Sequence, residues 1–251
     1  MPRSSFAKSL LVVATLIGPN AALAADNDAT AVIDKGIAAL GGEAKLVKAT
    51  ALKWKVEGKL TVEGNDNNFS VRYVTQGIDR SKVDFEGEIN GNEIKGGTVL
   101  DGNKGWRSFG ETNALDADAV DNEKRNAYLQ IIPIVLVPVK GVGFKAESGG
   151  ESKVNDKPVS VVKVTGPDGR TCKLSFDKET GLPVRMEATV VGFGGDDYEQ
   201  VTLFKDYKDF GGIQKATKLE LTRDGKPFLN VTVKEFAVVD QLPADTFGEP
   251  K

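Results

Sequence analysis

Apolar and polar residues alternate strictly over residues 52–62 of this chain. The odd positions between 53 and 61 carry lysine, glutamate and threonine. The even positions are apolar or glycine: Leu52, Trp54, Val56, Gly58, Leu60 and Val62. Successive side chains of a β-strand point to opposite faces, so this pattern predicts a strand with one buried and one solvated face.

The same alternation recurs along the chain and predicts a mainly β protein with a few helices. Turn pairs that accept a positive φ, such as Asn90-Gly91, Asp101-Gly102 and Asp168-Gly169, separate the segments. The expected strands are 51–63, 67–76, 80–89, 92–100, 104–109, 142–148, 158–165, 170–177, 182–192, 197–207, 213–223 and 227–238. An open antiparallel sheet of this width tends to curl, which gives it a concave apolar face.

Two segments depart from the strand pattern. Residues 26–49 predict a helix with an apolar stripe, interrupted by Gly41-Gly42 and followed by a second short turn. Residues 117–130 also predict a helix, and the apolar run 131–139 follows it. This run contains Pro133 and Pro138, so no continuous helix is expected through it. We expect these segments to cover the concave face of the sheet.

The first 24 residues have the features of a secretory signal peptide. Arg3 and Lys8 give a basic start, and the apolar stretch 10–17 is shorter than the ~20 residues of a membrane-spanning helix. Small residues at Ala22 and Ala24 predict cleavage after Ala24, with an uncleaved anchor as the alternative. Residues 25–251 then form a single domain, expected in the periplasm, with an extracellular location as the alternative.

Composition excludes several classes of function. The chain has no histidine and one cysteine, which rules out Ser-His or Cys-His catalytic pairs and His-based or thiolate zinc sites. Its net charge of −3 is spread over a mixed surface, which offers no footprint for nucleic acid. We therefore expect no catalytic residues, no metal and no cofactor. No membrane span and a monomeric state are also expected, and a carboxylate-based hydrolase is the least favoured alternative.

Several short segments, in this order, carry a resemblance to a known family. They are 39–44 (Ala-Leu-Gly-Gly-Glu-Ala), 101–107 (Asp-Gly-Asn-Lys-Gly-Trp-Arg), 176–184 (Phe-Asp-Lys-Glu-Thr-Gly-Leu-Pro-Val), 204–207 (Phe-Lys-Asp-Tyr), 211–213 (Gly-Gly-Ile) and 242–247 (Leu-Pro-Ala-Asp-Thr-Phe). The chain resembles the LolA/LolB-like family of outer-membrane lipoprotein-sorting and lipid-carrier proteins. The resemblance implies an unclosed antiparallel half-barrel of about eleven strands with helices as a lid, a width at which sheets curl. It also implies a carrier that shields acyl chains on the concave face and is not an enzyme.

The candidate ligand-binding residues form an apolar cavity wall and a lid over it. The predicted wall and lid residues are Trp54, Val56, Leu60, Phe69, Val71, Tyr73, Phe85, Ile131, Ile134, Leu136, Leu174, Phe176 and Met186. The expected ligand is a lipid, a lipoprotein acyl chain or another amphiphile, held by burial of its methylene groups. Two alternatives stay open. The same side chains could simply fill the core, or the domain could be a cell-envelope scaffold that binds a protein partner.

Overall fold

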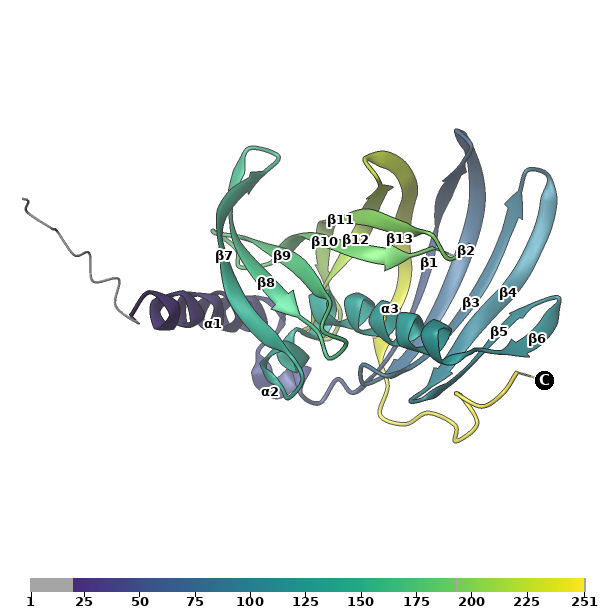
Figure 1. The fold of residues 1–251 in the computed structure, drawn as a ribbon, viewed down its shortest axis with the longest axis horizontal. Coiled ribbons are helices and arrows are strands. Elements are labelled where there is room, and N and C mark those ends of the chain that lie inside the picture. The colour runs from purple at the N-terminus through teal and green to yellow at the C-terminus, as the bar shows by residue number, and fades with distance from the viewer. Residues whose placement is uncertain (1–19, 193, 251) are drawn as a thin grey trace, which may run out of the picture.

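A single antiparallel sheet forms most of the protein in the computed structural model, which describes residues 20–192 and 194–250 (Figure 1). Within the described residues, thirteen strands, two more than the eleven or so that the resemblance implied, lie in the order β6-β5-β4-β3-β2-β1-β13-β12-β11-β10-β9-β8-β7. Their bounds are β1 Ala51–Val62, β2 Asn65–Gln76, β3 Arg80–Ile89, β4 Asn92–Asp101, β5 Lys104–Phe109, β6 Glu111–Ala114, β7 Lys145–Val154, β8 Lys157–Thr165, β9 Thr171–Asp177, β10 Pro183–Val191, β11 Asp197–Asp209, β12 Gln214–Arg223 and β13 Lys226–Val238. The predicted open antiparallel architecture is confirmed, with β6 as a short exposed strand that the alternation did not indicate.

The order of the strands determines where the connecting helix must lie. The chain builds β1 to β6 outward to one edge of the sheet, and then starts again at β7, the opposite edge. The connection between these edges is α3 (Ala117–Val135), followed by the short 3₁₀ helix η1 (Val137–Lys140). A connection from edge to edge has to cross a face of the sheet, and Figure 1 shows α3 lying across the hollow of the curved sheet.

The helical segment predicted at 26–49 is two helices. Helix α1 (Asn20–Leu40) ends at Gly41 and Gly42, which have φ values of 139° and 86°, and α2 (Glu43–Leu46) follows. These left-handed backbone angles are the ones that favour glycine. Helix α1 packs along β7, where Ser148 donates a hydrogen bond of 3.0 Å to Asp28. Residues 1–19 of the predicted signal peptide lie outside the described residues, so cleavage after Ala24 stays a prediction.

The helix predicted at 117–130 is longer than its sequence indicated. It begins at the N-cap Asp116, whose carboxylate accepts a hydrogen bond of 2.8 Å from the Ala119 amide, and it continues through Pro133 to Val135. The helix thus extends past its predicted end at Gln130, while the expectation that no continuous helix runs through residues 131–139 is confirmed. A proline this close to the end removes one backbone hydrogen bond, and burial of Ile132 and Ile134 offsets that loss.

The second proline of the apolar run does mark a break in the helix. Leu136 has a φ of 60° and ends α3, and Pro138 then lies in the first turn of η1, where no amide donor is needed. Among the residues that the structure describes, no helix combines the length and apolar character needed to span a membrane.

Candidate functional site

A largely apolar cavity of about 280 Å³ lies between α3 and the concave face of the sheet. Strands β1, β2 and β10 to β13 contribute its wall, and the side of α3 that carries Leu129, Pro133 and Ile134 covers it. The cavity is close to the smallest size, about 300 Å³, that is typical of ligand pockets in proteins. It lies where the sequence predicts an apolar hollow.

Aromatic side chains stiffen the wall on β1 and β2. Trp54 and Tyr73 are cross-strand partners whose rings stack at 4.7 Å with an angle of 9° between their planes. Phe69, further along β2, stacks on Phe85 of β3 at 5.7 Å. Burial raises the pKa of Tyr73 to about 12, so its phenol stays neutral. Stacked pairs of this kind add about 0.5–1.5 kcal/mol beyond the burial of their area, which favours a preformed wall.

The structure brings six of the predicted site residues together at the cavity. These are Trp54, Val56, Phe69, Tyr73, Ile134 and Met186. Leu60, Val71 and Phe85 belong to the same concave core but do not line the cavity. Ile131 lines a second apolar pocket of about 300 Å³ with Leu46 and Leu52.

The other three predicted residues fill the core instead of facing open space. Leu136, Leu174 and Phe176 are at most 2% exposed. Leu136 and Phe176 meet α1 at Gly36, where a Cβ atom would lie within 3 Å of both side chains. The predicted set is therefore divided between residues that line the cavity and residues that pack in the core.

Polar groups of the cavity were missed by the sequence interpretation. Lys215 of β12 is 5% exposed and lines the cavity together with Gln130 of α3 and Arg223 of β12. The odd-numbered residues of β12, which include Leu219 and Leu221, lie on the concave face of the sheet. The alternation along the strand therefore places Lys215 on this face as well. Applying the alternation to charged residues as well as apolar ones would have found it.

Lys215 lacks a counter-charge. Within the part of the chain that the structure describes, its ammonium group forms no hydrogen bond and no ion pair. Burial alone lowers the pKa of Lys215 to about 8 from the ordinary 10.5. At neutral pH the cavity wall therefore holds a largely protonated amine that is mostly removed from solvent.

Arg223 lies at the other end of the concave face of β12 and is well supported. Its guanidinium lies over the Phe228 ring at 3.8 Å and the Tyr198 ring at 5.0 Å, and its Nε donates a hydrogen bond of 3.1 Å to Gln200. Burial lowers its pKa from the ordinary value, although an arginine stays charged at any physiological pH. Arg223 thus adds a second fixed positive charge to the lining.

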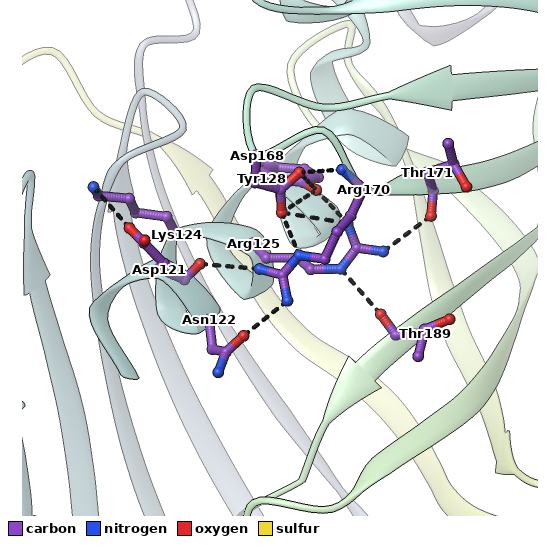
Figure 2. A network of polar contacts seen from close by, with 9 residues as sticks. All are labelled: Asp121, Asn122, Lys124, Arg125, Tyr128, Asp168, Arg170, Thr171 and Thr189. Atoms are coloured by element: carbon purple, nitrogen blue, oxygen red, sulfur yellow. Dashed lines mark hydrogen bonds and ion pairs between the residues drawn. The ribbon is translucent and has the colours of Figure 1, made fainter. Parts of the chain in front are cut away.

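A buried polar network, the latch, fixes α3 to the sheet (Figure 2). Arg125, which is 2% exposed, donates hydrogen bonds of 3.0 Å to the carbonyl oxygens of Thr189 in β10 and Thr171 in β9. It also donates to the Tyr128 hydroxyl and pairs with Asp168 at 3.5 Å. The latch therefore joins the covering helix to two strands and to the β8–β9 turn.

Hydrogen bonds within the latch keep Asp168 ionised. Burial opposes its charge, but hydrogen bonds from Arg170 and Tyr128 hold the pKa of Asp168 below its ordinary value. Burial also raises the pKa of the Tyr128 hydroxyl well above its ordinary value. The latch consequently keeps its charges through the neutral range and does not act as a pH switch there.

Other features of the surface and core suit a ligand or a reaction less well. A wider hollow of about 710 Å³ near Glu57 and Lys234 is open and lined mainly by charged and polar residues. Cys172 is buried, and burial raises the pKa of its thiol to about 12, which leaves it unreactive as a nucleophile. Among the described residues, no three carboxylate or cysteine side chains gather as a metal site would require.

Comparison with solved structures identifies the fold. The chain is similar to a LolA superfamily protein from Nitrosomonas europaea, with a TM-score of 0.58, 10% identity, and coverage of 88% of this chain and 97% of that one. It is also similar to a domain of a putative outer membrane lipoprotein-sorting protein from Vibrio parahaemolyticus, with a TM-score of 0.56, 11% identity, and coverage of 89% and 97%.

A third solved structure shows the same arrangement. A DUF1329 family protein from Desulfovibrio piger matches with a TM-score of 0.54 at 11% identity, over 87% of this chain and 96% of that one. No family model and no curated protein matches the sequence itself. The resemblance drawn from the sequence is confirmed at the level of architecture: this chain has a LolA-like fold.

Proposed function

We propose that this protein is an exported, periplasmic carrier that binds an amphiphile in the cavity beneath α3. The observation that carries the proposal is the partly enclosed, largely apolar cavity of about 280 Å³, walled in part by stacked aromatic rings. Each methylene group moved from water into such a site contributes about 0.8 kcal/mol. Two of the similar solved structures are described as a LolA superfamily protein and a lipoprotein-sorting domain, which supports a carrier of lipid-like cargo.

The volume of the cavity limits the cargo. A methylene occupies about as much space as a water molecule, roughly 30 Å³, so the cavity holds a chain of about nine such groups. Two chains of roughly fifteen methylenes each would need about 900 Å³ at the same volume per group. The arrangement of α3 therefore fits one medium-length chain, and longer or additional acyl chains would extend outside the cavity unless α3 moves.

Extraction of the natively purified protein tests the proposal. We expect organic solvent to release an amphiphile with a chain of about eight to twelve carbons, identified by mass spectrometry. Decan-1-ol, an uncharged probe of the cavity, is also expected to bind in calorimetry. A protein that yields no amphiphile and binds neither decan-1-ol nor decanoate would contradict the carrier function and favour the scaffold alternative.

A matched pair of variants separates the cavity from the outer surface. Leu219→Trp places a larger side chain in the cavity, whereas Val238→Trp changes a side chain that is 39% exposed. The larger side chain takes up the space of about two methylene groups of the ligand, so the binding free energy is weaker by about 1.6 kcal/mol. This loss lowers the affinity for decan-1-ol about tenfold. The Val238 variant is expected to bind as the wild type does, and equal affinities of both variants would place the probe elsewhere.

A further inference from the structure

Lys215 is a buried lysine in the wall of the cavity. Buried lysines in folded proteins are almost always paired with an acid or otherwise hydrogen-bonded, because an isolated charge is costly to remove from water. Lys215 is 5% exposed and has no such partner among the residues that the structure describes. Its cross-strand neighbour on β11 is Lys208, an exposed residue of the same charge. No carboxylate side chain of the described residues therefore serves as the counter-ion of Lys215.

The charge of the cavity lining is one-sided. Among the residues that the structure describes, Lys215 and Arg223 line it, and no aspartate or glutamate does. The one further titratable side chain in this described lining is Tyr73, which is neutral, and the lining residues of β1, β10, β11, β13 and α3 carry no charge. The chain as a whole carries a net charge of −3. A positively charged hollow in an acidic protein favours a negatively charged occupant.

A second unpaired group lines the same cavity. The side-chain oxygen of Gln130 in α3 is buried and has no hydrogen-bond partner. Rotating this amide by half a turn places its NH₂ group there instead, where it could donate to an oxygen of a ligand. Gln130 lies on the covering helix and Lys215 on the sheet, so both walls of the cavity offer a group whose hydrogen bonds are incomplete.

We propose that the cavity binds a single-chain anionic amphiphile whose acidic head group pairs with Lys215. This inference rests on the proposed function, since it names the chemical class of the cargo. A carboxylate is the head group best matched to the space, because the cavity has room for about nine methylene-sized groups in all. The apolar wall around Trp54 and Ile134 takes the chain, and the amine supplies the counter-ion.

Three probes with the same chain test the choice of head group. Decanoate, decan-1-ol and decyltrimethylammonium are titrated into the full-length protein at pH 7, below the concentrations at which they form micelles, with acetate as a probe of the head group alone. A charge-assisted hydrogen bond predicts that decanoate binds roughly ten- to a hundredfold more tightly than decan-1-ol. Acetate is expected not to bind measurably, because it lacks the chain.

Variants at two lysines of β12 assign the effect to one residue. Lys215→Met is expected to remove the preference for decanoate over decan-1-ol, and Lys215→Arg to keep it. Lys218→Met is the control, since Lys218 is exposed on the other face of the strand and pairs with Asp206. Binding of decan-1-ol by the Lys215→Met variant shows that its cavity is intact.

The outcomes separate the two proposals. Equal affinities for decanoate and decan-1-ol, or an undiminished preference in Lys215→Met, would overturn the anionic ligand and leave the carrier function standing. If acetate binds as tightly as decanoate, the chain adds nothing, and the site would be assigned to a free small anion instead. Failure of every ten-carbon probe to bind would overturn both.

Discussion

Lys215 costs the folded protein stability. Its pKa is about 8 in the folded state and 10.5 when unperturbed, so the folded state gives up this proton at a lower pH than the unfolded chain does. Each pKa unit corresponds to about 1.36 kcal/mol, so this difference in pKa lowers the free energy of unfolding by roughly 3 kcal/mol. The penalty is complete below pH 8, because both states are then protonated and only the folded state holds the charge in a largely buried site.

Replacing this lysine by an uncharged side chain of similar length should therefore stabilise the protein. Lys215→Met is expected to raise the free energy of unfolding at pH 7 by up to about 3 kcal/mol. The gain shrinks as the pH rises from 8 to 10.5, since the wild type then loses its buried charge before the unfolded chain does. Urea denaturation of both proteins at several pH values measures this difference in the free energy of unfolding. A variant that is less stable than the wild type at pH 7 would contradict the prediction.

The binding of an anion should follow the protonation of the same amine. Decanoate affinity is expected to be constant between about pH 6 and 7, where the ligand is ionised, and to fall as the pH rises through about 8, because Lys215 loses its charge there. The affinity for decan-1-ol stays flat over the same range. Arg223 stays charged and Tyr73 stays neutral, so neither contributes to the change. Calorimetry between pH 6 and about 10 gives the profile, and the same fall in Lys215→Met would assign it to another group.

The sequence could place Lys215 but could not show that it is unpaired. Alternation along β12 fixes the face on which a residue lies, since it is a property of one strand. A counter-ion comes from strands or helices far away in the chain, and the register between them is not visible in a single sequence. Leu174 and Phe176 illustrate the same limit, because the alternation puts them on the concave face but not inside or outside the cavity.

At the scale of elements, the latch holds α3 over the cavity. Arg125 donates hydrogen bonds to one backbone carbonyl oxygen near an end of β9 and one near an end of β10. It also contacts Tyr128 and Asp168. Removing one partner of such a buried group leaves the others desolvated without a donor, which is more costly than the net value of the bonds themselves.

Arg125→Met is accordingly expected to lower the free energy of unfolding by about 3–5 kcal/mol, as measured by urea denaturation. Lys173→Met is the comparison, because Lys173 forms an exposed pair with Glu187 at 4.0 Å. Pairs of that kind contribute about 0–1 kcal/mol. Similar losses in the free energy of unfolding for both variants would show that the latch does not stabilise the packing of α3 on the sheet.

The elements themselves were largely predictable, and the failures have local causes. Strands such as β1 and β12 follow from alternation with turn residues at their ends. Strand β6 was missed because its four residues are all exposed and show no alternation. Helix α3 was cut short because proline was treated as an absolute stop, whereas Pro133 lies two residues before the helix ends.

At the scale of the whole molecule, the cavity sets a length scale for cargo. In a series of fatty acids from six to sixteen carbons, the binding free energy should improve by about 0.8 kcal/mol per methylene until about nine groups are buried. Longer chains gain little, since their ends stay outside the cavity. Calorimetric titration of the series gives the slope and the plateau. A slope that persists to sixteen carbons would mean that α3 or the sheet moves to make room.

The pairing of β1 with β13 has a consequence for how the chain acquires its shape. These two strands join residues 51–62 to residues 226–238 in the middle of the sheet. A chain synthesised from its N-terminus therefore leaves one edge of β1 unpaired until β13 has been made, and contacts between such distant segments form slowly. During refolding, amides of β1 that face β13 should become protected from hydrogen exchange later than those of the β2–β3 hairpin. Until β1 and β13 pair, the open edge of β1 is available for pairing with other chains.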